Sequence, residues 1–381
     1  MLQDFLNTKP LYYDKIDYTR MPRVYKQIQH HFANPQVIHI IGTNGKGTTG
    51  RFLATALVSA GFTVGHYTSP HILEFNERIW LNGTNTSLEI LENAHQKLLQ
   101  ILTHDQANAL SYFEYTTLLA MFIYKDVEYV VLEAGLGGEY DATAVFDNIL
   151  TLITPIATDH EAFLGNSIEE IVTTKVNAVK KVAILATQTN DIVNTRAEAI
   201  VKEKKSLFFH ADSFLTKNAR QKIARIEKEL ALEKYLLTNL SLAISALEYL
   251  QIEYASQSFQ GARLFGRLSK IDENIIVDVG HNVLAASAIE NALRGRKFTL
   301  VYNSYKDKNY KEILTILKPI IQKVEIIAVN DSRIEEEAIL EETLSHLAVK
   351  YGKFNGIHKA EQYLVFGSFS VVEAFLKAYN E

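Results

Sequence analysis

Short apolar runs alternate with amphipathic stretches along the first two thirds of the chain. Runs typical of buried strands, rich in β-branched residues, occupy 37–41, 62–67, 127–132, 150–154, 182–186 and 207–209. Helical patterns occupy 49–60, 88–103, 113–125, 167–179 and 189–204, with mostly helical structure over 219–251 and one or two short helices within 1–36. Because strands and helices alternate, we expect a parallel, doubly wound sheet.

A second alternating unit begins at residue 268. We expect strands over 275–279, 298–302, 323–329 and 363–366, and helices over 284–294, 310–322, 335–348 and 369–379. The patch 252–267 contains several Ser, Gln and Gly residues, and we interpret it as an interdomain linker. The expected fold class is therefore α/β. A P-loop-containing domain with a mostly parallel, doubly wound sheet occupies 1–260, and a smaller Rossmann-like α/β domain occupies 267–381.

A glycine-rich stretch, Gly42-Thr-Asn-Gly-Lys-Gly-Thr-Thr-Gly50, joins the first buried strand to the following helix. Glycines let backbone amides face an anion, and the helix N-terminus adds partial positive charge. Lys46 can reach the outer phosphates of a nucleotide, and a hydroxyl from Thr48 or Thr49 can bind Mg2+. Because Gly47 separates Lys46 from Thr48, the stretch departs from the common Walker pattern. A strand–helix turn without a ligand is the alternative.

Acidic side chains stand where predicted strands end. Glu133 follows one strand, and the pair Asp159-His160 follows another. In the second unit, Asp278 and His281 occupy a strand end and the turn after it. Ligands of open α/β sheets collect at such strand ends, so these groups are candidates for metal binding or catalysis. A purely structural carboxylate is the alternative for Glu133.

The segment 68–79 mixes polar groups with Phe75 and contains Pro70. A long loop of this kind near a phosphate site is expected to bind substrate, and a solvated surface loop is the alternative. Near the C-terminus, Ser368 can cap the last helix, whose N-terminus would then be an anion site. A plain helix cap is the alternative there.

Composition narrows the functional classes. The sequence has no cysteine, which excludes disulfides, Cys-ligated zinc, Fe–S clusters and a Cys nucleophile. Its net charge is −5 and no long basic run occurs, so we expect neither nucleic-acid nor membrane-surface binding. No apolar span of about 18 residues and no apolar signal core are found. We therefore expect a soluble, cytoplasmic protein.

Several short motifs together resemble one family. They are Gly42-Thr-Asn-Gly-Lys-Gly-Thr48, Tyr67-Thr-Ser-Pro-His71, Phe75-Asn-Glu-Arg-Ile79, Phe113-Glu114, Leu132-Glu-Ala-Gly-Leu-Gly-Gly138, Asp141-Ala-Thr143, Thr158-Asp-His160 and Leu164-Gly165. In this order they closely resemble folylpolyglutamate synthase and dihydrofolate synthase, the folate branch of the Mur ligase superfamily. The resemblance covers essentially the whole chain. The second and third motifs are specific to the folate branch.

The resemblance implies an ATP-dependent amide ligase. ATP phosphorylates a carboxylate on dihydropteroate or a reduced folate such as tetrahydrofolate, and the amine of L-glutamate attacks the acyl phosphate. The family also implies two Mg2+ sites, ATP bound in the crevice between the domains, and a monomer. Two alternatives remain open. One is a Mur-type peptide ligase acting on a UDP-sugar precursor, and the other is a non-catalytic phosphate-loop nucleotide-binding protein.

The resemblance also assigns roles to individual residues. The metal ligands would be Thr48, Glu133, His160 and Lys175, the last carbamylated by CO2. The ATP-binding residues would be Asn44, Gly45, Lys46, Gly47, Thr48, Thr49, Asn239, Arg267, Asp278 and His281. The folate-binding residues would be Ser69, Pro70, His71, Phe75, Arg78, Phe113, Asp141 and Ala142. Glutamate would be bound by Lys306 and Ser368. The catalytic set would be Lys46, Glu133, His160, Lys175, Arg267 and His281. On its residue pattern alone, Lys175 is expected to lie on the surface.

Some positions depart from the family pattern. The second-domain motif, usually Asp-Gly-Ala-His-Asn-Pro, is Asp278-Val-Gly-His-Asn-Val283 here. The usual Pro-Gly-Arg is Phe265-Gly-Arg267, and the usual Leu-Gly-Gly-Arg is Leu136-Gly-Gly-Glu139. These changes leave the phosphate and metal chemistry intact and affect the nucleotide-base and substrate contacts.

Overall fold

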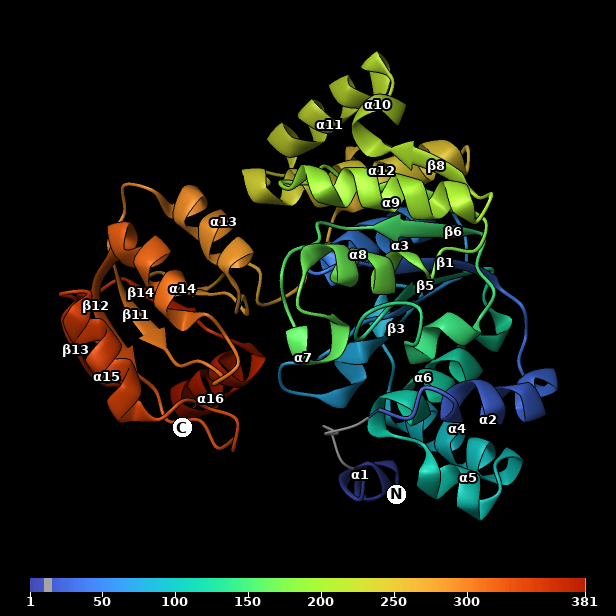
Figure 1. The fold of residues 1–381 in the computed structure, drawn as a ribbon, viewed down its shortest axis with the longest axis horizontal. Coiled ribbons are helices and arrows are strands. Elements are labelled where there is room, and N and C mark those ends of the chain that lie inside the picture. The colour runs from blue at the N-terminus through green and yellow to red at the C-terminus, as the bar shows by residue number, and fades with distance from the viewer. Residues whose placement is uncertain (10–15, 381) are drawn as a thin grey trace. The chain divides into compact units, whose positions relative to one another are not determined.

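The chain was analysed as a computed structural model that describes residues 1–9 and 16–380 (Figure 1). It forms two compact units, Met1–Ala262 and Arg263–Glu381. Each unit has its own sheet, and no strand is shared between the two sheets in the described part of the chain. Both units are α/β structures, as the alternation of apolar runs predicts.

The first unit is built on an eight-stranded sheet in the order β4-β3-β2-β5-β1-β6-β7-β8. Its strands are β1 (Gln36–Ile41), β2 (Val64–Tyr67), β3 (Ile79–Leu81), β4 (Thr84–Asn85), β5 (Tyr129–Glu133), β6 (Leu150–Ile153), β7 (Val182–Leu185) and β8 (Leu207–His210). In this sheet order, every neighbouring pair among β2, β5, β1, β6, β7 and β8 is parallel. The pairs β2–β3 and β3–β4 are antiparallel. The prediction of a mostly parallel, doubly wound sheet is confirmed.

Helices cover both faces of this sheet (Figure 1). The helices of the first unit are α1 (Leu2–Asn7), α2 (Arg20–Ile28), α3 (Lys46–Ser59), α4 (Leu88–Ile101), α5 (His104–Ala109), α6 (Tyr112–Ile123), α7 (Glu161–Leu164), α8 (Ile168–Val176), α9 (Asp191–Glu203), α10 (Ala211–Phe214), α11 (Lys217–Glu229) and α12 (Leu237–Tyr249). Strand β1 shows why both faces are covered, because its successive side chains point to opposite faces of the sheet and are apolar on both. Ile38 and Ile40 belong to the core formed with α3 and α12. Val37 belongs to the core with α4 and α6, and Ile41 to the core with α8 and α9.

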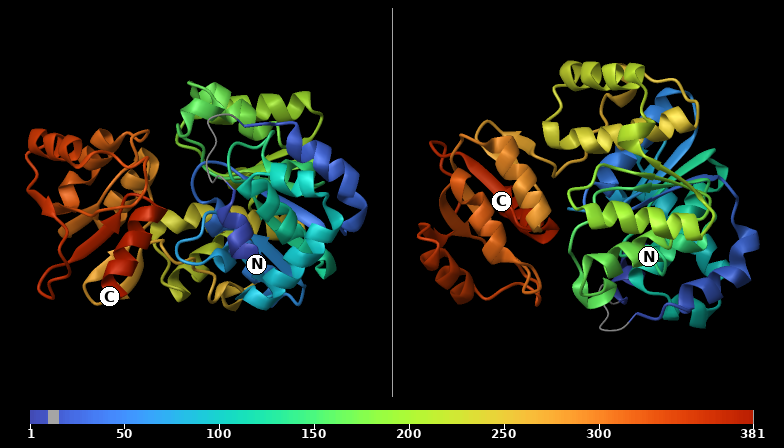
Figure 2. Two further views of the ribbon diagram at one scale, coloured as in Figure 1. Left: turned by 90° about the horizontal axis from the view of Figure 1, so that it is seen from below. Right: turned by 45° about the horizontal axis from the view of Figure 1, so that its top comes forward.

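The second unit has a six-stranded sheet in the order β13-β12-β11-β14-β10-β9. Its strands are β9 (Ser269–Asp272), β10 (Ile275–Val277), β11 (Phe298–Tyr302), β12 (Ile321–Ile326), β13 (Tyr351–Lys353) and β14 (Tyr363–Phe366). Its helices are α13 (Val283–Leu293), α14 (Tyr310–Leu317), α15 (Glu337–His346) and α16 (Phe369–Asn380). Only β9 runs antiparallel to its neighbour. Figure 2 shows this sheet from two further directions, with its helices packed alongside it.

Two small antiparallel elements were not predicted from the sequence. Strands β3 and β4 form a hairpin at the edge of the first sheet, and β9 forms the edge of the second. The hairpin turn is Asn82-Gly83, with left-handed φ values of 47° and 109°. Asn-Gly directly after the short apolar segment Ile79-Trp80-Leu81 is a hairpin signal, so this element could have been found. The short strand β13 and helix α5 were also missed.

The expected linker over 252–267 is wrong for its first part. Tyr254, Phe259 and Ala262 are buried and belong to the core shared with α3 and α12. A short 3-10 helix, η6 (Ser256–Phe259), contacts α3 in this region. The polar residues that suggested a linker are themselves buried, since Ser256 and Ser258 are each less than one tenth exposed. Burial through tertiary packing overrides the local composition here.

The helices are of moderate length. The longest in the described ranges, α3 and α4, have 14 residues each. Crossing the apolar part of a bilayer takes about 20 residues. Within residues 1–9 and 16–380, none of the helices combines the length and apolar character needed to cross a membrane.

We expect Leu53→Ala to lower the free energy of unfolding of the first unit by about 2–5 kcal/mol, because Leu53 on α3 is fully buried and its truncation leaves a cavity. Urea unfolding followed by the fluorescence of Trp80 measures this, since Trp80 is the single tryptophan and lies in the same core. The matched control is Leu88→Ala at a residue that is 74% exposed, with an expected change below about 0.5 kcal/mol. Equal losses in both variants would contradict the packing described.

Candidate functional site

The predicted site residues of the first unit gather because parallel strands end at one edge of the sheet. Ile40 at the end of β1 pairs with Glu133 of β5, and Tyr67 of β2 pairs with Leu132. Ile41 pairs with Ile153 at the end of β6. The segments that follow these four strands therefore emerge side by side, as expected for the carboxyl edge of an open α/β sheet.

The glycine-rich loop follows β1 and is held by close backbone contacts. Gly42 and Gly45 have left-handed φ values of 137° and 86°, and a Cβ atom would overlap Thr154 at the first and Asn239 at the second. The amide of Asn239 on α12 donates to the Gly45 carbonyl at 3.1 Å and to the Thr49 hydroxyl at 3.3 Å. Asn239 thus fixes the start of α3, which begins at Lys46, three residues before the predicted start.

Lys46 folds back over the loop. Its Nζ donates to the carbonyls of Gly42 at 3.4 Å and Thr43 at 3.2 Å, and lies 4.0 Å from Oε1 of Glu133. The Thr48 hydroxyl, in contrast to that of Thr49, has no hydrogen-bond partner among the residues the structure describes, so it can serve as an oxygen ligand. A flexible lysine beside an uncommitted hydroxyl is the arrangement that a phosphate–cation complex needs.

Lys175 is buried, which corrects the expectation that it lies on the surface. Only 4% of the residue is exposed, and its Nζ donates to the Gly42 carbonyl at 2.8 Å. Burial, reinforced by the nearby charge of Lys46, lowers the pKa of Lys175 to about 7, while the carboxylates of Asp159 and Asp141 act in the opposite direction. A lysine of this kind is partly neutral near pH 7, so its amine can act as a nucleophile toward CO2.

The helix pattern around Lys175 carries a signal that could have revealed its burial. Ile171 and Val172, four and three residues earlier, are fully buried, as is Val176. Residues three and four apart share a helix face, so Lys175 lies on the apolar face of α8. A charged residue on such a face needs a partner in the interior, and here that partner is the Gly42 carbonyl.

Glu133 ends β5 and points its carboxylate into the same region. The residue is 4% exposed. Its Oε2 accepts hydrogen bonds from the Thr68 hydroxyl and from the Ser69 amide, the latter at 3.3 Å, while Oε1 faces Lys46. The two oxygens therefore differ in their surroundings, and Oε1 is the one turned toward the phosphate loop.

Asp159 and His160 follow β6. His160 has a left-handed φ of 53° at the start of α7, and its amide donates to Asp159 Oδ1 at 2.9 Å. The His160 side chain is 43% exposed, whereas that of Asp159 is only 7% exposed. The negative charge of the Asp159 carboxylate acts to raise the pKa of Lys175, against the effect of burial. The strand-end position selected both residues and the family resemblance assigned only His160 to the metal, yet Asp159 is the better buried of the two.

The segment after β2 is a packed loop, not a solvated one. The Thr68 amide donates to the Arg78 carbonyl at 3.0 Å, and the Arg78 Nε donates to His71 Nδ1 at 2.7 Å. The Glu77 carboxylate accepts the backbone amides of three successive residues, 72–74. Burial and the charge of Arg78 lower the pKa of His71 to about 4, so His71 is neutral at pH 7. The Phe75 ring packs edge-on against Tyr112.

Phe113, Asp141 and Ala142 lie near the loop that follows β5. The Phe113 ring lies so close over Gly135 that a Cβ atom there would overlap it. Asp141 accepts the amides of Leu136 at 2.8 Å and Thr143 at 2.9 Å, and burial raises the pKa of its carboxyl group. Asp141 therefore shapes this loop from within. Ala142 is buried at the start of a short 3-10 helix, η4 (Ala142–Val145).

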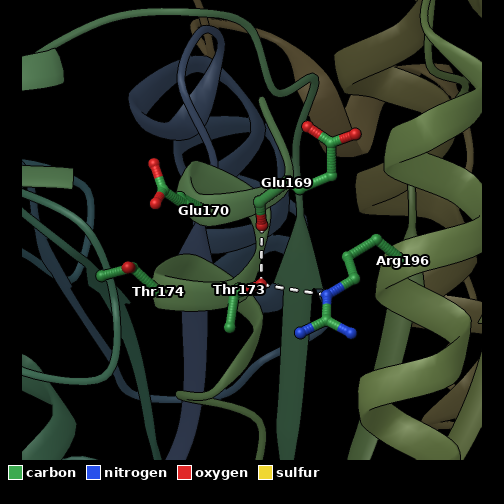
Figure 3. A pocket seen from close by; sticks show the side chains of 5 residues that line it. All are labelled: Glu169, Glu170, Thr173, Thr174 and Arg196. Carbon is green, nitrogen blue, oxygen red and sulfur yellow. Dashed lines mark hydrogen bonds between the residues drawn. The ribbon is translucent and has the colours of Figure 1, made fainter. Parts of the chain in front are cut away.

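Two hollows lie outside the cluster around Gly42. A cavity of about 430 Å³ beside Asp141 is lined in part by Tyr18 and Tyr140, whose ring centroids are 4.7 Å apart; sequence reasoning singled out neither tyrosine. Another of about 460 Å³ is lined by Glu169, Glu170, Thr173, Thr174 and Arg196 (Figure 3). In this second hollow the Arg196 Nε donates to the Thr173 hydroxyl at 3.0 Å. It contains none of the predicted site residues.

In the second unit, the turns after β10 hold Asp278 and its neighbours. The Asp278 carboxylate accepts the amides of Leu268 at 2.9 Å and Gly280 at 2.8 Å, and burial raises its pKa. Arg267 donates to the Gly266 carbonyl at 3.0 Å and lies over the Phe369 ring at 5.5 Å. Asp278 thus ties the Arg267 turn to the turn that carries His281, and these three predicted residues belong to one edge of the second sheet.

The two residues predicted to bind glutamate differ in environment. Ser368 is buried, and its hydroxyl accepts the Val371 amide at 3.1 Å, so it acts as the cap of α16. Lys306 is exposed on the loop after β11, and its amide donates to the Arg333 carbonyl at 2.9 Å. The hydrogen bond of the Ser368 hydroxyl is therefore that of an ordinary helix cap. The assignments of Lys306 and Ser368 to glutamate stay predictions.

Lys175 should make the stability of the first unit rise with pH. Between about pH 7 and its ordinary pKa of 10.5, the unfolded chain binds a proton at this lysine that the folded chain does not. The cost of burying the charged lysine therefore has its full value below about pH 7, shrinks as the pH rises, and is gone above about pH 10.5. Urea unfolding in EDTA should therefore show a steeper rise with pH for the wild type than for Lys175→Met. Parallel curves for the two proteins would contradict the buried, partly neutral amine.

Comparisons with known proteins agree with this geometry. No protein-family model matches the chain. A Haemophilus influenzae dihydrofolate synthase/folylpolyglutamate synthase is 29% identical over 390 residues, covering 90% of this chain and 88% of the relative. The enzyme of the same name from Buchnera aphidicola subsp. Schizaphis graminum is 30% identical over 365 residues, covering 88% and 86%.

Solved structures give the same result. Helicobacter pylori folylpolyglutamate synthetase is 39% identical, with a TM-score of 0.79 and coverage of 100% of this chain and 98% of that one. A Yersinia pestis bifunctional folylpolyglutamate synthase/dihydrofolate synthase complexed with AMPPNP and Mn ion shares the fold, at 24% identity, a TM-score of 0.83 and coverage of 99% and 97%. So does Escherichia coli FolC in complex with DHPP and ADP, at 23% identity, a TM-score of 0.81 and coverage of 99% and 96%. The chain belongs to the dihydrofolate synthase/folylpolyglutamate synthase family of ATP-dependent ligases.

Proposed function

We propose that this chain joins L-glutamate to the carboxylate of dihydropteroate, and also of reduced folates, at the expense of ATP and with the help of Mg2+. The observation that supports this best is the meeting of Lys46, Lys175 and Glu133 around the Gly42 carbonyl at the start of α3. The relatives favour this reading over a ligase for UDP-sugar precursors and over a non-catalytic nucleotide-binding protein.

The reaction needs two displacements. A carboxylate oxygen of the acceptor attacks the γ-phosphorus of ATP and ADP leaves, which gives an acyl phosphate. The uncharged amine of glutamate then attacks the carbonyl carbon, the phosphate leaves with the bonding electrons, and the amine nitrogen loses a proton as the amide forms. The protein's part is to align the reactants and offset charge on the transferred group. Lys46 serves this by exchanging its bonds to the Gly42 and Thr43 carbonyls for phosphate oxygens.

The side chains around the loop fit a magnesium site. Mg2+ prefers oxygen ligands, and the cluster offers the uncommitted Thr48 hydroxyl and Oε1 of the Glu133 carboxylate. We assign His160 and the neighbouring Asp159 to the same site because they follow β6 at the same edge of the sheet. Bound Mg2+ supplies positive charge to the phosphate oxygens, and the Yersinia pestis structure holds Mn ion with AMPPNP.

Lys175 is assigned as a carbamate. A neutral amine attacks CO2 and loses a proton, which replaces a buried cation by an anion. The nitrogen keeps one hydrogen, so the bond to the Gly42 carbonyl can persist after the change. The product would carry a negative charge and remove the repulsion between Lys175 and Lys46.

The acceptor is assigned to the loop of residues 68–78 and to Phe113, Asp141 and Ala142. This assignment rests on the aromatic rings of the buried Phe75 and the partly buried Phe113 and on the hydrogen bonds that hold the loop. Asn239, Arg267, Asp278 and His281 remain assigned to ATP, and Lys306 and Ser368 to glutamate. An Escherichia coli relative with the same fold binds DHPP and ADP.

We expect purified protein to release ADP from ATP, Mg2+ and L-glutamate only when dihydropteroate or tetrahydrofolate is added. A coupled ADP assay with each acceptor as the sole substrate measures both activities separately. A UDP-sugar peptide precursor serves as the control acceptor and should give the rate seen without acceptor. ADP release that no pteroate or folate increases would contradict the proposal.

Carbamylation can be measured directly. Protein equilibrated with 13C-labelled bicarbonate should show a carbamate signal in its 13C NMR spectrum, because the buried amine of Lys175 is partly neutral near pH 7. The Lys175→Met variant should lack this signal. The control variant Lys181→Met should retain the signal, because Lys181 is an exposed lysine directly before β7. A spectrum of the wild type without a carbamate signal would contradict the assignment.

A further inference from the structure

Thr68 occupies a junction between the loop of residues 68–78 and the carboxylate of Glu133. It is the first residue after β2 and is less than one tenth exposed. Its hydroxyl donates to Oε2 of Glu133, and the next backbone amide, that of Ser69, donates to the same oxygen at 3.3 Å. Oε2 is therefore hydrogen-bonded to the loop, and Oε1 is the oxygen that faces Lys46.

The other side of Thr68 is held as firmly. Its amide donates to the carbonyl of Arg78 at the far end of the loop, at 3.0 Å, which closes the loop on itself. Inside the loop, the Glu77 carboxylate gathers three backbone amides, and Arg78 binds His71. The position of the Thr68 hydroxyl thus depends on the conformation of the whole loop.

Geometry limits what Glu133 can do without this contact. A glutamate side chain has three rotatable bonds, and the hydrogen bonds from the Thr68 hydroxyl and the Ser69 amide orient its carboxylate at Oε2. Hydrogen-bond partners behind a metal-binding carboxylate fix its orientation and tune its affinity. Loss of the hydroxyl would remove one of the hydrogen bonds that hold Oε2 and would loosen the orientation of the carboxylate.

We propose that Thr68 is a positioning residue that fixes the Glu133 carboxylate for cation binding and makes that binding depend on the conformation of the loop of residues 68–78. This inference rests on the proposed function, in which Glu133 is a metal ligand. Thr68 itself touches neither nucleotide nor metal in this account. Its role is to present Oε1 of Glu133 by holding Oε2.

The test is the affinity for Mn2+ in the presence of AMPPNP, measured by the EPR signal of free Mn2+ without turnover. Thr68→Val replaces the hydroxyl by a methyl group of similar size and should weaken Mn2+ binding by about 10–100-fold. Thr68→Ser keeps the hydroxyl and should bind Mn2+ nearly as the wild type does. The matched control is Thr86→Val, since Thr86 is also buried and its hydroxyl has no partner in the described part of the chain. It should leave the affinity unchanged.

The same variants separate a positioning role from a general structural one. For Thr68→Val, the kcat of ligation should recover at high Mg2+ while the Mg2+ requirement stays raised. In a Glu133→Gln background, Thr68→Val should cause no further loss of Mn2+ affinity. Trp80 fluorescence in urea reports whether each variant is folded, and Thr68→Ala provides the same comparison if the valine variant is not.

The outcomes distinguish the two levels of the account. If Glu133→Gln weakens Mn2+ binding but Thr68→Val does not, the positioning role is overturned and the proposed function stands. An equal loss in Thr68→Ser and Thr68→Val also overturns it, because the hydroxyl would then not be the cause. If Glu133→Gln itself binds Mn2+ as the wild type does, the assignment of Glu133 as a metal ligand fails, and the proposed site fails with it.

Discussion

The contact on which the rest of the site depends is the hydrogen bond from the buried amine of Lys175 to the carbonyl of Gly42. Lys46 donates to the same oxygen, so two lysines converge on one backbone group. Such a pair is unfavourable in the interior unless charge is reduced or balanced. Partial neutrality of Lys175 reduces it, and the carboxylates of Glu133 and Asp159 balance what remains. A region with two lysine amines beside a glycine-rich loop is suited to bind a polyanion.

The sheet makes this convergence possible. Gly42, Glu133 and the segment with Asp159 follow neighbouring parallel strands, so the order of strands alone brings them to one edge. The approach is close, because Thr154 and Asn239 occupy the space that side chains at Gly42 and Gly45 would fill. Lys175 comes from a helix on one face of the sheet, and Asn239 from a helix on the other. The loop is thus fixed from both faces.

Patterns local in sequence were sufficient for the fold and for part of the site. Alternating apolar runs predicted both sheets, and strand-end positions selected Glu133 and Asp278 as candidates. The phosphate loop was evident from glycines next to a strand and a helix. Asn82-Gly83 carried an equally local signal, and the hairpin it forms was overlooked. The predicted strands, the phosphate loop and the overlooked hairpin all depend on patterns within a few neighbouring residues.

Long-range packing decided the rest. The helix pattern around Lys175 could have revealed its burial, but the partner of its amine, Gly42, lies 133 positions earlier, and nothing local in the sequence indicates that contact. The resemblance to known ligases named Lys175, but only the fold supplies a physical reason. The segment before residue 263 looked like a linker because its serines are polar, yet they are buried beside α3. Thr68 likewise gained meaning only when its hydroxyl was seen to hold Glu133.

The most direct test of the central claim separates nucleotide binding from ligation in Lys175→Ala. The proposed mechanism has Lys175 balance charge beside the phosphate loop during phosphoryl transfer, while the loop amides and Lys46 hold the nucleotide. It predicts that ATP binding, measured by calorimetry with AMPPNP, persists in this variant while acceptor-dependent ADP release is lost. Full ligase activity in Lys175→Ala would contradict the account.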